Sequence, residues 1–224
     1  MEGEEYMFNL KKEINFYKLI WIFMIGSVLG YAVEMIWCFI RNGYFESRQG
    51  LLYGPFSPVY GIGCVLCTIL LYKIAKWDGF IIFLISAVLG GFFEYTCSWV
   101  QQKMVGTISW DYTSKALSIN GRTSIEYCVF WGILGLFFIK EIYPLFNKII
   151  NHFSNKTIKI WTYIFIIIMV PNIILSALAV RREVARINHV KANNAIDRFL
   201  DEHYPNSYLK KVYPNMIFPK QKNK

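Results

Sequence analysis

Apolar residues occur along this chain in long runs, and short polar segments separate the runs. About 20 apolar residues suffice to cross the hydrocarbon core of a bilayer as a helix. The pattern therefore predicts five membrane-spanning helices, over approximately residues 18–40, 57–75, 79–99, 123–139 and 160–180. Pro171 and Asn172 predict a kink in the last of them. Beyond Arg181 the pattern is that of a soluble segment, with one amphipathic helix near 190–203 and irregular structure after Pro205.

The first and third predicted spans contain the same short pattern of small residues. Residues 25–34 read Ile-Gly-Ser-Val-Leu-Gly-Tyr-Ala-Val-Glu, and residues 85–94 read Ile-Ser-Ala-Val-Leu-Gly-Gly-Phe-Phe-Glu. Side chains four residues apart share one face of a helix. Two stripes of small residues that end in a carboxylate follow: Gly26, Gly30 and Glu34, and Ser86, Gly90 and Glu94. Small residues let helices approach closely in lipid, whereas a carboxylate within a span is costly unless it is paired or used.

The repeated pattern predicts the organisation of the whole chain. We expect an all-α membrane protein of about five transmembrane helices, built from two parallel two-helix repeats, a fifth helix and a basic C-terminal tail. The predicted regions are an N-terminal segment (1–17), a membrane domain (18–143) of two hairpins (18–75 and 79–143), a link with the fifth helix (144–180) and a basic soluble tail (181–224). The small-residue stripes would serve contacts within one chain or between two copies of a homo-oligomer equally well.

Composition agrees with a membrane location. The chain is 55% hydrophobic and 18% aromatic, which is too apolar for an ordinary soluble domain. The net charge is +9, and residues 181–224 hold ten Lys and Arg against four Asp and Glu, which favours contact with the anionic headgroups of the lipid bilayer. Nucleic acid is excluded as a partner, because the sequence holds no aromatic-plus-basic nucleic-acid module. Three histidines scattered outside the spans predict no metal site, and no cofactor is evident.

The candidate site lies where the connections 41–56 and 101–122 meet the membrane. Glu34 and Glu94 are nearer to the span ends that lead into these connections, and four further charged residues come from the connections or just beyond them: Arg48, Asp111, Arg122 and Glu126. We expect the six charges to line one polar pocket for a substrate or an ion. The structural alternatives are buried ion pairs for the two glutamates, a helix cap for Glu126 and an interfacial turn for Asp111. Glycines and prolines are expected to shape the start of the second span: Gly54, Pro55, Pro58, Gly61 and Gly63.

Several motifs resemble those of the CmpB-type putative ABC-transporter permease family, small bacterial multi-pass proteins. The resemblance rests on the segment 50–63 (Gly-Leu-Leu-Tyr-Gly-Pro-Phe-Ser-Pro-Val-Tyr-Gly-Ile-Gly), Trp110-Asp111-Tyr112, Asn120-Gly121-Arg122, Trp131-Gly132, the run 176–179 before Arg181, and the segments 201–205 and 213–216. It covers roughly residues 16–218. It implies a multi-pass protein of the cell membrane and a transport function.

Three functions fit this pattern, and we favour the first. A permease-like transport component would need a separate ATP-binding subunit, because the chain has no Gly-Lys dipeptide and therefore no Walker A loop. An intramembrane enzyme or a lipid-binding protein would hold a phosphate headgroup with Arg48 and Arg122 and use Glu34 or Glu94 as a general base. A structural assembly subunit would use the same polar residues to join helices. An enzyme is less expected than a transport component.

Overall fold

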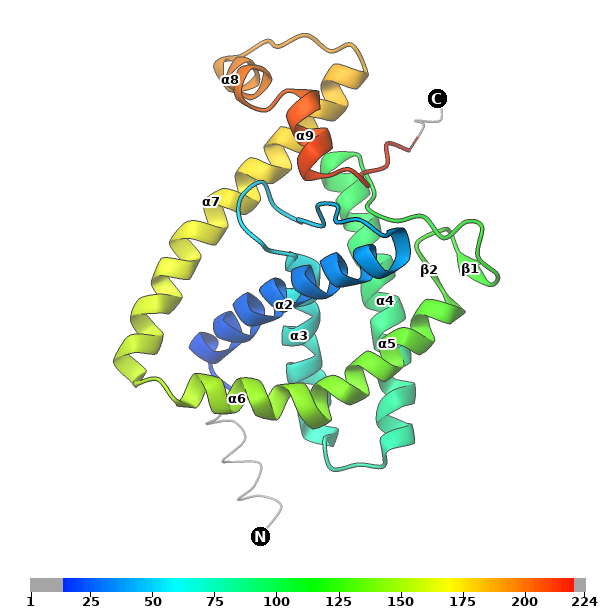
Figure 1. The fold of residues 1–224 in the computed structure, drawn as a ribbon, viewed down its shortest axis with the longest axis vertical. Coiled ribbons are helices and arrows are strands. Elements are labelled where there is room, and N and C mark those ends of the chain that lie inside the picture. The colour runs from blue at the N-terminus through cyan, green and yellow to red at the C-terminus, as the bar shows by residue number, and fades with distance from the viewer. Residues whose placement is uncertain (1–13, 220–224) are drawn as a thin grey trace.

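The computed structural model describes residues 14–219, which are helical through most of their length (Figure 1). The elements are α2 (Phe16–Asn42), α3 (Pro58–Leu71), η1 (Tyr72–Ile74), α4 (Gly79–Val105), β1 (Ser118–Ile119), β2 (Thr123–Ser124), α5 (Ile125–Phe137), η2 (Phe138–Ile142), α6 (Tyr143–Asn151), α7 (Asn155–Ile187), α8 (Ala195–His203) and α9 (Asn206–Val212). The strands β1 and β2 form one small antiparallel hairpin. The expected all-α class is therefore confirmed.

Four helical stretches are long and apolar enough to cross a membrane. They are α2, α4, the stretch Ile125–Asn151 and α7, and a shorter apolar stretch, Pro58–Ile74, stands at the position of the second predicted span. At 1.5 Å per residue that shorter stretch is about 25 Å long, slightly less than the hydrocarbon core of a bilayer. The chain is therefore a multi-pass membrane protein.

The helix after the second connection is longer than the sequence pattern predicts. We expected a span that ends near residue 139 and a polar link behind it, but α5 continues through the single π turn η2 into α6 and ends at Asn151. Three residues of this extension, Tyr143, Phe146 and Ile150, are buried in the core and recur at helical spacing. Lys140 donates to the carbonyl oxygen of Ala75 (2.7 Å), so this charged residue is accommodated beside the turn that follows η1.

Both α2 and α4 have a side-chain N-cap and a glycine C-cap. The side chain of Asn15 accepts the N–H of Lys18 (3.0 Å) at the start of α2, and the side chain of Asp78 accepts the N–H of Phe80 (2.9 Å) at the start of α4. Each helix ends at a glycine in the left-handed region, Gly43 (φ 77°) and Gly106 (φ 82°). The two long connections therefore leave their helices in the same way.

The helices pair in the order of the chain. The helix α2 packs against α3, α4 packs against α5, and α3 also contacts α4. The long helix α7 contacts both α2 and α4. Figure 1 shows it running from the end of α6 towards α8. The main apolar core lies between these helices, around buried residues that include Trp21, Ile22, Leu71, Ile82 and Phe146.

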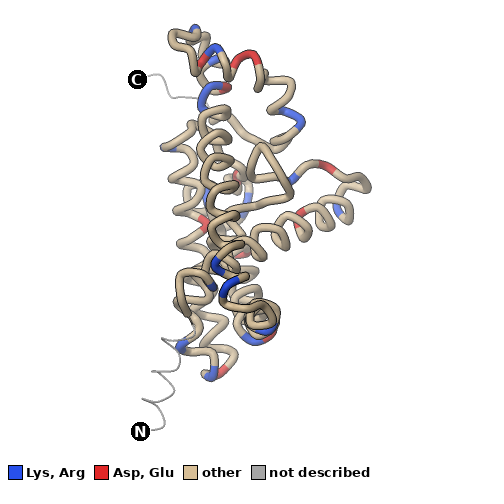
Figure 2. Tube along the Cα trace, turned by 90° about the vertical axis from the view of Figure 1, so that its left-hand side faces the viewer, with Lys and Arg blue, Asp and Glu red and all other residues tan. Residues whose placement is uncertain are grey.

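The C-terminal segment folds back onto the end of α7. Leu200 of α8, Tyr204 directly after α8 and Leu209 of α9 form a small core with Ala179 of α7 and Leu52 of the first connection. Figure 1 shows α8 and α9 together at one end of the molecule, and Figure 2 shows charged residues of both signs gathered there. The predicted amphipathic helix is confirmed as α8. The irregular structure predicted after Pro205 is wrong for residues 206–212, which form α9.

Candidate functional site

The carboxylate of Glu94 lies buried in the span α4; among the described acidic residues, Glu183 of α7 is buried to the same extent. Glu94 is 6% exposed, and its carboxylate accepts hydrogen bonds from the Tyr112 hydroxyl (2.9 Å) and the Thr123 hydroxyl (2.8 Å). The side chain of Trp131, whose indole can only donate, also hydrogen-bonds to it. Burial, reinforced by the neighbouring Glu94, raises the pKa of the Tyr112 phenol well above its ordinary value. Tyr112 therefore keeps its proton and acts as a donor.

The second carboxylate, Glu34, has a simpler environment. It is half-buried and accepts a hydrogen bond from the hydroxyl of Tyr60 in α3. The phenol of Tyr60 also lies within electrostatic reach of Glu94 and Arg48, and Tyr60 is likewise close to Tyr112. Both glutamates thus border one group of side chains from α2, α3, α4 and the second connection. We call Glu34, Tyr60, Tyr112, Glu94 and Thr123 the acid cluster.

Close helix approach at glycine positions the aromatic donors. A methyl group added at Gly30 would overlap the Cβ atom and ring of Tyr60, and one added at Gly90 would overlap the Cβ atom and ring of Trp131. Glu34 and Glu94 lie one helical turn beyond these glycines, on the same stripe. The small residues of the stripes therefore make contacts within this chain, and these contacts deliver a donor to each carboxylate.

The other small residues support the same helix pairs. Gly26 faces Cys64, because a methyl group added there would lie 2.8 Å from the Cys64 sulfur. Gly61 of α3 is in turn pressed against Phe23 and Ser27 of α2. Ser86 occupies the matching place between α4 and α5, where it contacts Gly135.

The segment before α3 has the shape that its glycines and prolines predict. Gly54 adopts a positive φ of 80°, and Pro58 is the first residue of α3. Pro55 between them is exposed. Gly63 faces the second hairpin, since a methyl group added there would lie 3.5 Å from Phe93, an ordinary contact.

Arg48 lies beside the acid cluster but pairs with a different acid. Its Nη2 atom is 3.3 Å from Glu46 Oε2 and 3.5 Å from Cys38 Sγ. Its Nε atom is buried and has no hydrogen-bond partner among residues 14–219. The alternative of an ion pair between Arg48 and Glu34 is not realised among the described residues, although Arg48 lies within electrostatic reach of Tyr60.

Arg122 extends the stripe of Glu94 towards the end of α4. Its guanidinium donates to Ser98 Oγ (3.0 Å) and to Gln102 Oε1, and it lies over the ring of Tyr95. Because Ser98 and Gln102 follow Glu94 at intervals of four residues, the guanidinium lies one to two turns from the carboxylate. Within the described part of the chain, neutral oxygens rather than a carboxylate hold this charge.

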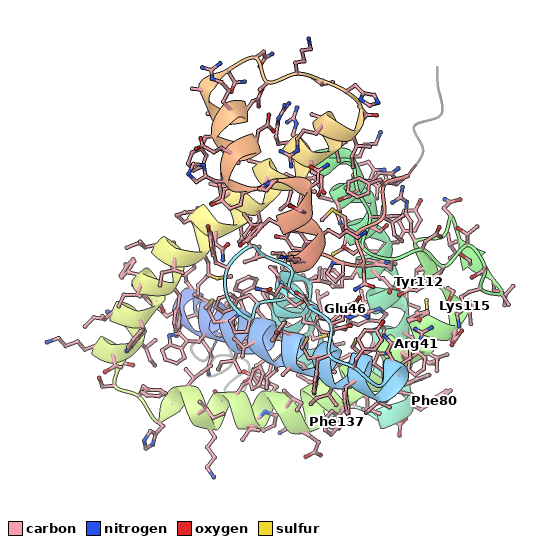
Figure 3. All side chains as sticks on the ribbon, turned by 45° about the horizontal axis from the view of Figure 1, so that its top comes forward. Arg41, Glu46, Phe80, Tyr112, Lys115 and Phe137 are labelled. Atoms are coloured by element: carbon pink, nitrogen blue, oxygen red, sulfur yellow. The ribbon has the colours of Figure 1, made fainter. Side chains whose placement is uncertain are left out.

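Asp111 and Glu126 lie away from the acid cluster. Asp111 is exposed and accepts the N–H of Thr113 (2.9 Å) and the Thr113 hydroxyl; these hydrogen bonds lower the pKa of its carboxyl. Glu126 pairs with Lys115 (3.1 Å) on the surface, where both side chains are about half exposed. Figure 3 shows Tyr112 and Lys115 on the side of α4 and α5, and Arg41 and Glu46 on the side of α2. Asp111 thus lies in a turn of the second connection, and Glu126 lies in the first turn of α5, the position considered for a helix cap.

Three residues of the acid cluster, Tyr60, Tyr112 and Thr123, were not singled out from the sequence, and neither were the loop contacts of Asn172 and Ser176. Tyr60 and Tyr112 lie inside the motifs 50–63 and 110–112, so their position in those motifs was the available signal. Asn172 of α7 accepts the N–H of Tyr53 (3.3 Å) and donates to its carbonyl oxygen (2.7 Å). Ser176 accepts the N–H of Leu52 (2.9 Å). A polar residue directly after Pro171 within an apolar run was the signal for Asn172.

Comparison with known proteins identifies the family. A family model described as "Putative ABC-transporter type IV" matches residues 21–177, which include every residue of the acid cluster. The chain belongs to this family. No curated protein and no solved structure matches it. The matched range ends within α7, so α8 and α9 lie outside it.

Proposed function

We propose that this protein is the membrane-embedded component of an ATP-driven transport system and that the acid cluster lies on its transport path. The family supports the class of system. A separate ATP-binding subunit supplies the energy in this proposal, because the sequence of this chain contains no Walker A loop. The acid cluster supports the proposed location of the transport path, because it joins residues of both hairpins at the end of the spans where the long connections begin.

The environment of Glu94 is the observation that carries this proposal. Its carboxylate is buried among neutral donors, and no Lys or Arg forms an ion pair with it within residues 14–219. A negative charge in a membrane span attracts a cation or a proton unless a fixed positive charge neutralises it. With Glu34 on the other side of Tyr60, the cluster suits a proton or a cationic substrate group better than an anion.

We further infer that the two hairpins are copies of one unit, which supports a shared path between them. Gly30 contacts Tyr60 in the first hairpin, and Gly90 contacts Trp131 in the second. Gly61 meets Phe23, and Gly132 meets Phe83. In both pairs of contacts, the residue numbers in the first helix differ by 60 between the hairpins (23 and 83, 30 and 90). The residue numbers in the second helix differ by 71 (60 and 131, 61 and 132). A constant shift in two independent contacts is expected of a duplicated helix pair.

Uptake by a reconstituted complex tests the proposal. The protein is purified together with its ATP-binding subunit, reconstituted in liposomes and supplied with ATP and a ¹³C-labelled metabolite extract, and mass spectrometry identifies what accumulates. We expect ATP-dependent accumulation of a cationic metabolite by the wild type and its loss in Glu94→Gln. The control Glu126→Gln changes an exposed acid and should transport like the wild type.

Two results would overturn the proposal. A complex that holds no ATPase, or that hydrolyses ATP without accumulating any labelled compound, would exclude a permease. Unchanged uptake in both Glu34→Gln and Glu94→Gln would remove the acid cluster from the path. If those variants melt at lower temperature but transport normally, the glutamates serve assembly.

Headgroup binding is the second candidate, and Arg122 favours it. Neutral groups, Ser98 and Gln102, hold its guanidinium, so its charge is available to a phosphate. Mass spectrometry of protein extracted in mild detergent tests this function. A phospholipid that is retained by the wild type and lost in Arg122→Gln would support it, and identical lipid content in both proteins would exclude it.

A further inference from the structure

The helix α8 has an apolar face that the rest of the described chain covers only in part. Leu200 is 2% exposed, whereas Ile196 is 61% and Phe199 46% exposed. Residues 196, 199, 200 and 203 lie on one side of the helix, because successive residues are separated by 100°. His203 belongs to the same side and stacks on Phe199. One edge of this face therefore packs inside the protein, while Ile196 and Phe199 on the other edge remain exposed, although Phe199 contacts the rings of His203 and Tyr204.

The contacts of the covered edge fix the level of α8 relative to the membrane. Leu200 and Tyr204 pack with Leu175 and Ala179 of α7. These two residues lie in the last turns of the apolar run that ends at Val180, directly before Arg181. A run of about 20 residues fills the hydrocarbon core, so its last turns reach the headgroup boundary. The helix α8 consequently lies at that boundary, as expected of an interfacial helix.

The charges around this face suit anionic headgroups. Five exposed basic residues occur in the segment 181–211: Arg181, Lys191, Arg198, Lys210 and Lys211. Among the acids of α8, Asp201 is neutralised by Arg182 (2.8 Å) and Arg186 (2.7 Å), whereas Asp197 and Glu202 form no ion pair within the described residues. Each basic residue close to an anionic membrane surface adds to the attraction.

We propose that α8 is an interfacial membrane anchor: Ile196 and Phe199 insert at the boundary of the bilayer, and the surrounding Lys and Arg side chains bind anionic phospholipid headgroups. This role is separate from transport. An anchored α8 would also fix the C-terminal segment, which contacts the first connection. There Ser47 donates to the carbonyl oxygen of Val212 (2.7 Å), and the hydroxyls of Tyr53 and Tyr204 are 2.7 Å apart.

Photo-crosslinking of the full chain tests the insertion. Phe199 or Ile196 is replaced by p-benzoylphenylalanine, the protein is irradiated in native membranes, and the adducts are identified by mass spectrometry. The matched control carries the same group at Glu202, an exposed charged position about 120° around the helix from Ile196. We expect phospholipid adducts at 199 and 196 in at least about tenfold excess over position 202, because only the apolar face enters the acyl boundary. Both replaced residues are exposed, so the core around Leu200 is retained, as an unchanged melting temperature would verify.

A protein adduct at positions 199 and 196 would overturn the proposal, because it would assign the face to a partner subunit. Equal yields at 199 and 202, or no adduct at either apolar position, would overturn it as well.

Hydrogen exchange tests the headgroup contacts. The full chain is placed in nanodiscs of phosphatidylcholine alone or with one quarter phosphatidylglycerol. We expect α8 and α9 to exchange several-fold more slowly in the anionic discs, because bound headgroups protect the helix. The triple variant Lys191→Gln/Lys210→Gln/Lys211→Gln should exchange equally in both. Equal exchange of the wild type in the two kinds of disc would contradict headgroup binding.

Discussion

The two hairpins place a glutamate at the same position of their first helix but surround it differently. In α2–α3, Glu34 is half-buried and has one phenol as a donor. In α4–α5, Glu94 is buried and has two hydroxyl donors, with Trp131 in the place that Tyr60 occupies in the first hairpin. The difference shows that the two hairpins hold carboxylates of unequal exposure, one half-buried and one enclosed.

The two long connections differ in what holds them. The first, residues 43–57, is tied to distant elements: Ser47 to Val212, Tyr53 to Asn172 and Tyr204. The second, residues 106–122, is held mainly by its own hairpin. Trp110 donates to the carbonyl oxygen of Arg122 (2.9 Å), and the backbone bridge between Ile108 and Ile217 links it to the C-terminal segment. The first connection therefore depends more on the folded tail than the second does.

The largest expected effect comes from filling the close helix contacts. Gly30→Ala and Gly90→Ala each place a methyl group inside the side chain of Tyr60 or Trp131. Overpacking of this kind costs about 1–3 kcal/mol or more, because the helices must separate. The melting temperature of the detergent-solubilised protein, followed by tryptophan fluorescence, should fall in both variants.

Gly63→Ala is the matched control, since its added methyl group meets Phe93 at 3.5 Å. It should melt like the wild type. A large loss in only one of the Gly30 and Gly90 variants would contradict the equivalence of the two hairpins.

The next effect separates the two glutamates. Removing the Glu94 carboxylate by Glu94→Ala leaves the hydroxyls of Tyr112 and Thr123 and the Trp131 indole without their acceptor, whereas Glu34→Ala leaves only Tyr60. A buried group without its partner costs about 1–3 kcal/mol in water-soluble proteins and about 0.6 kcal/mol on average within membranes. The Glu94 variant should therefore melt at a lower temperature than the Glu34 variant. Equal melting temperatures would mean that the additional donors do not stabilise the fold.

The third effect distinguishes the two connections by pH. Hydrogen bonds from Arg182 and Arg186 lower the pKa of Asp201 to about 2. An unfolded Asp has a pKa of about 3.9, so the stabilisation from this carboxylate is complete above about pH 4 and is lost as the pH falls towards 2. Pepsin, which is active in this range, should then cleave the tail and residues 43–57 before residues 106–122.

Asp201→Asn supplies the reference for this experiment, because it removes the titrating group. In this variant, pepsin should already cleave the tail and residues 43–57 first at pH 5, and the pattern should change little on further acidification. Cleavage of residues 106–122 first in the wild type would show that the tail does not hold the first connection preferentially.

The smallest effect concerns the surface acids of the connections. The pair of Glu126 and Lys115 is about half exposed, so Glu126→Gln should change the free energy of unfolding by less than about 0.5 kcal/mol. Glu46, which is less exposed and also accepts from Asn215 (3.0 Å), should lose slightly more when it is changed to Gln. Thermal unfolding in parallel with the wild type measures both. A larger loss in the Glu126 variant would reverse this order.

The local pattern of the chain was sufficient for the helices and for part of the site. Hydropathy located the apolar stretches, and helical periodicity aligned Gly30 with Glu34 and Gly90 with Glu94. The extension of α5 through α6 could not be read in this way, because Lys140 and Glu141 interrupt the apolar run, and only packing against the turn after η1 makes the continuation favourable. The same holds for α9, which forms where Leu209 reaches the core beside α7 and Val212 is buried.

The partners of the charged side chains depend on contacts between distant segments. From spacing alone, ion pairs of the glutamates with Arg48 or Arg122 were one open alternative. In the described chain Glu46 pairs with Arg48, and the neutral oxygens of Ser98 and Gln102 hold Arg122. Periodicity specifies which residues share a helix face, since that follows from the geometry of a single helix. It does not specify which side chain arrives from another helix or loop, because that choice depends on helix rotation, on the path of the connections and on the burial that follows.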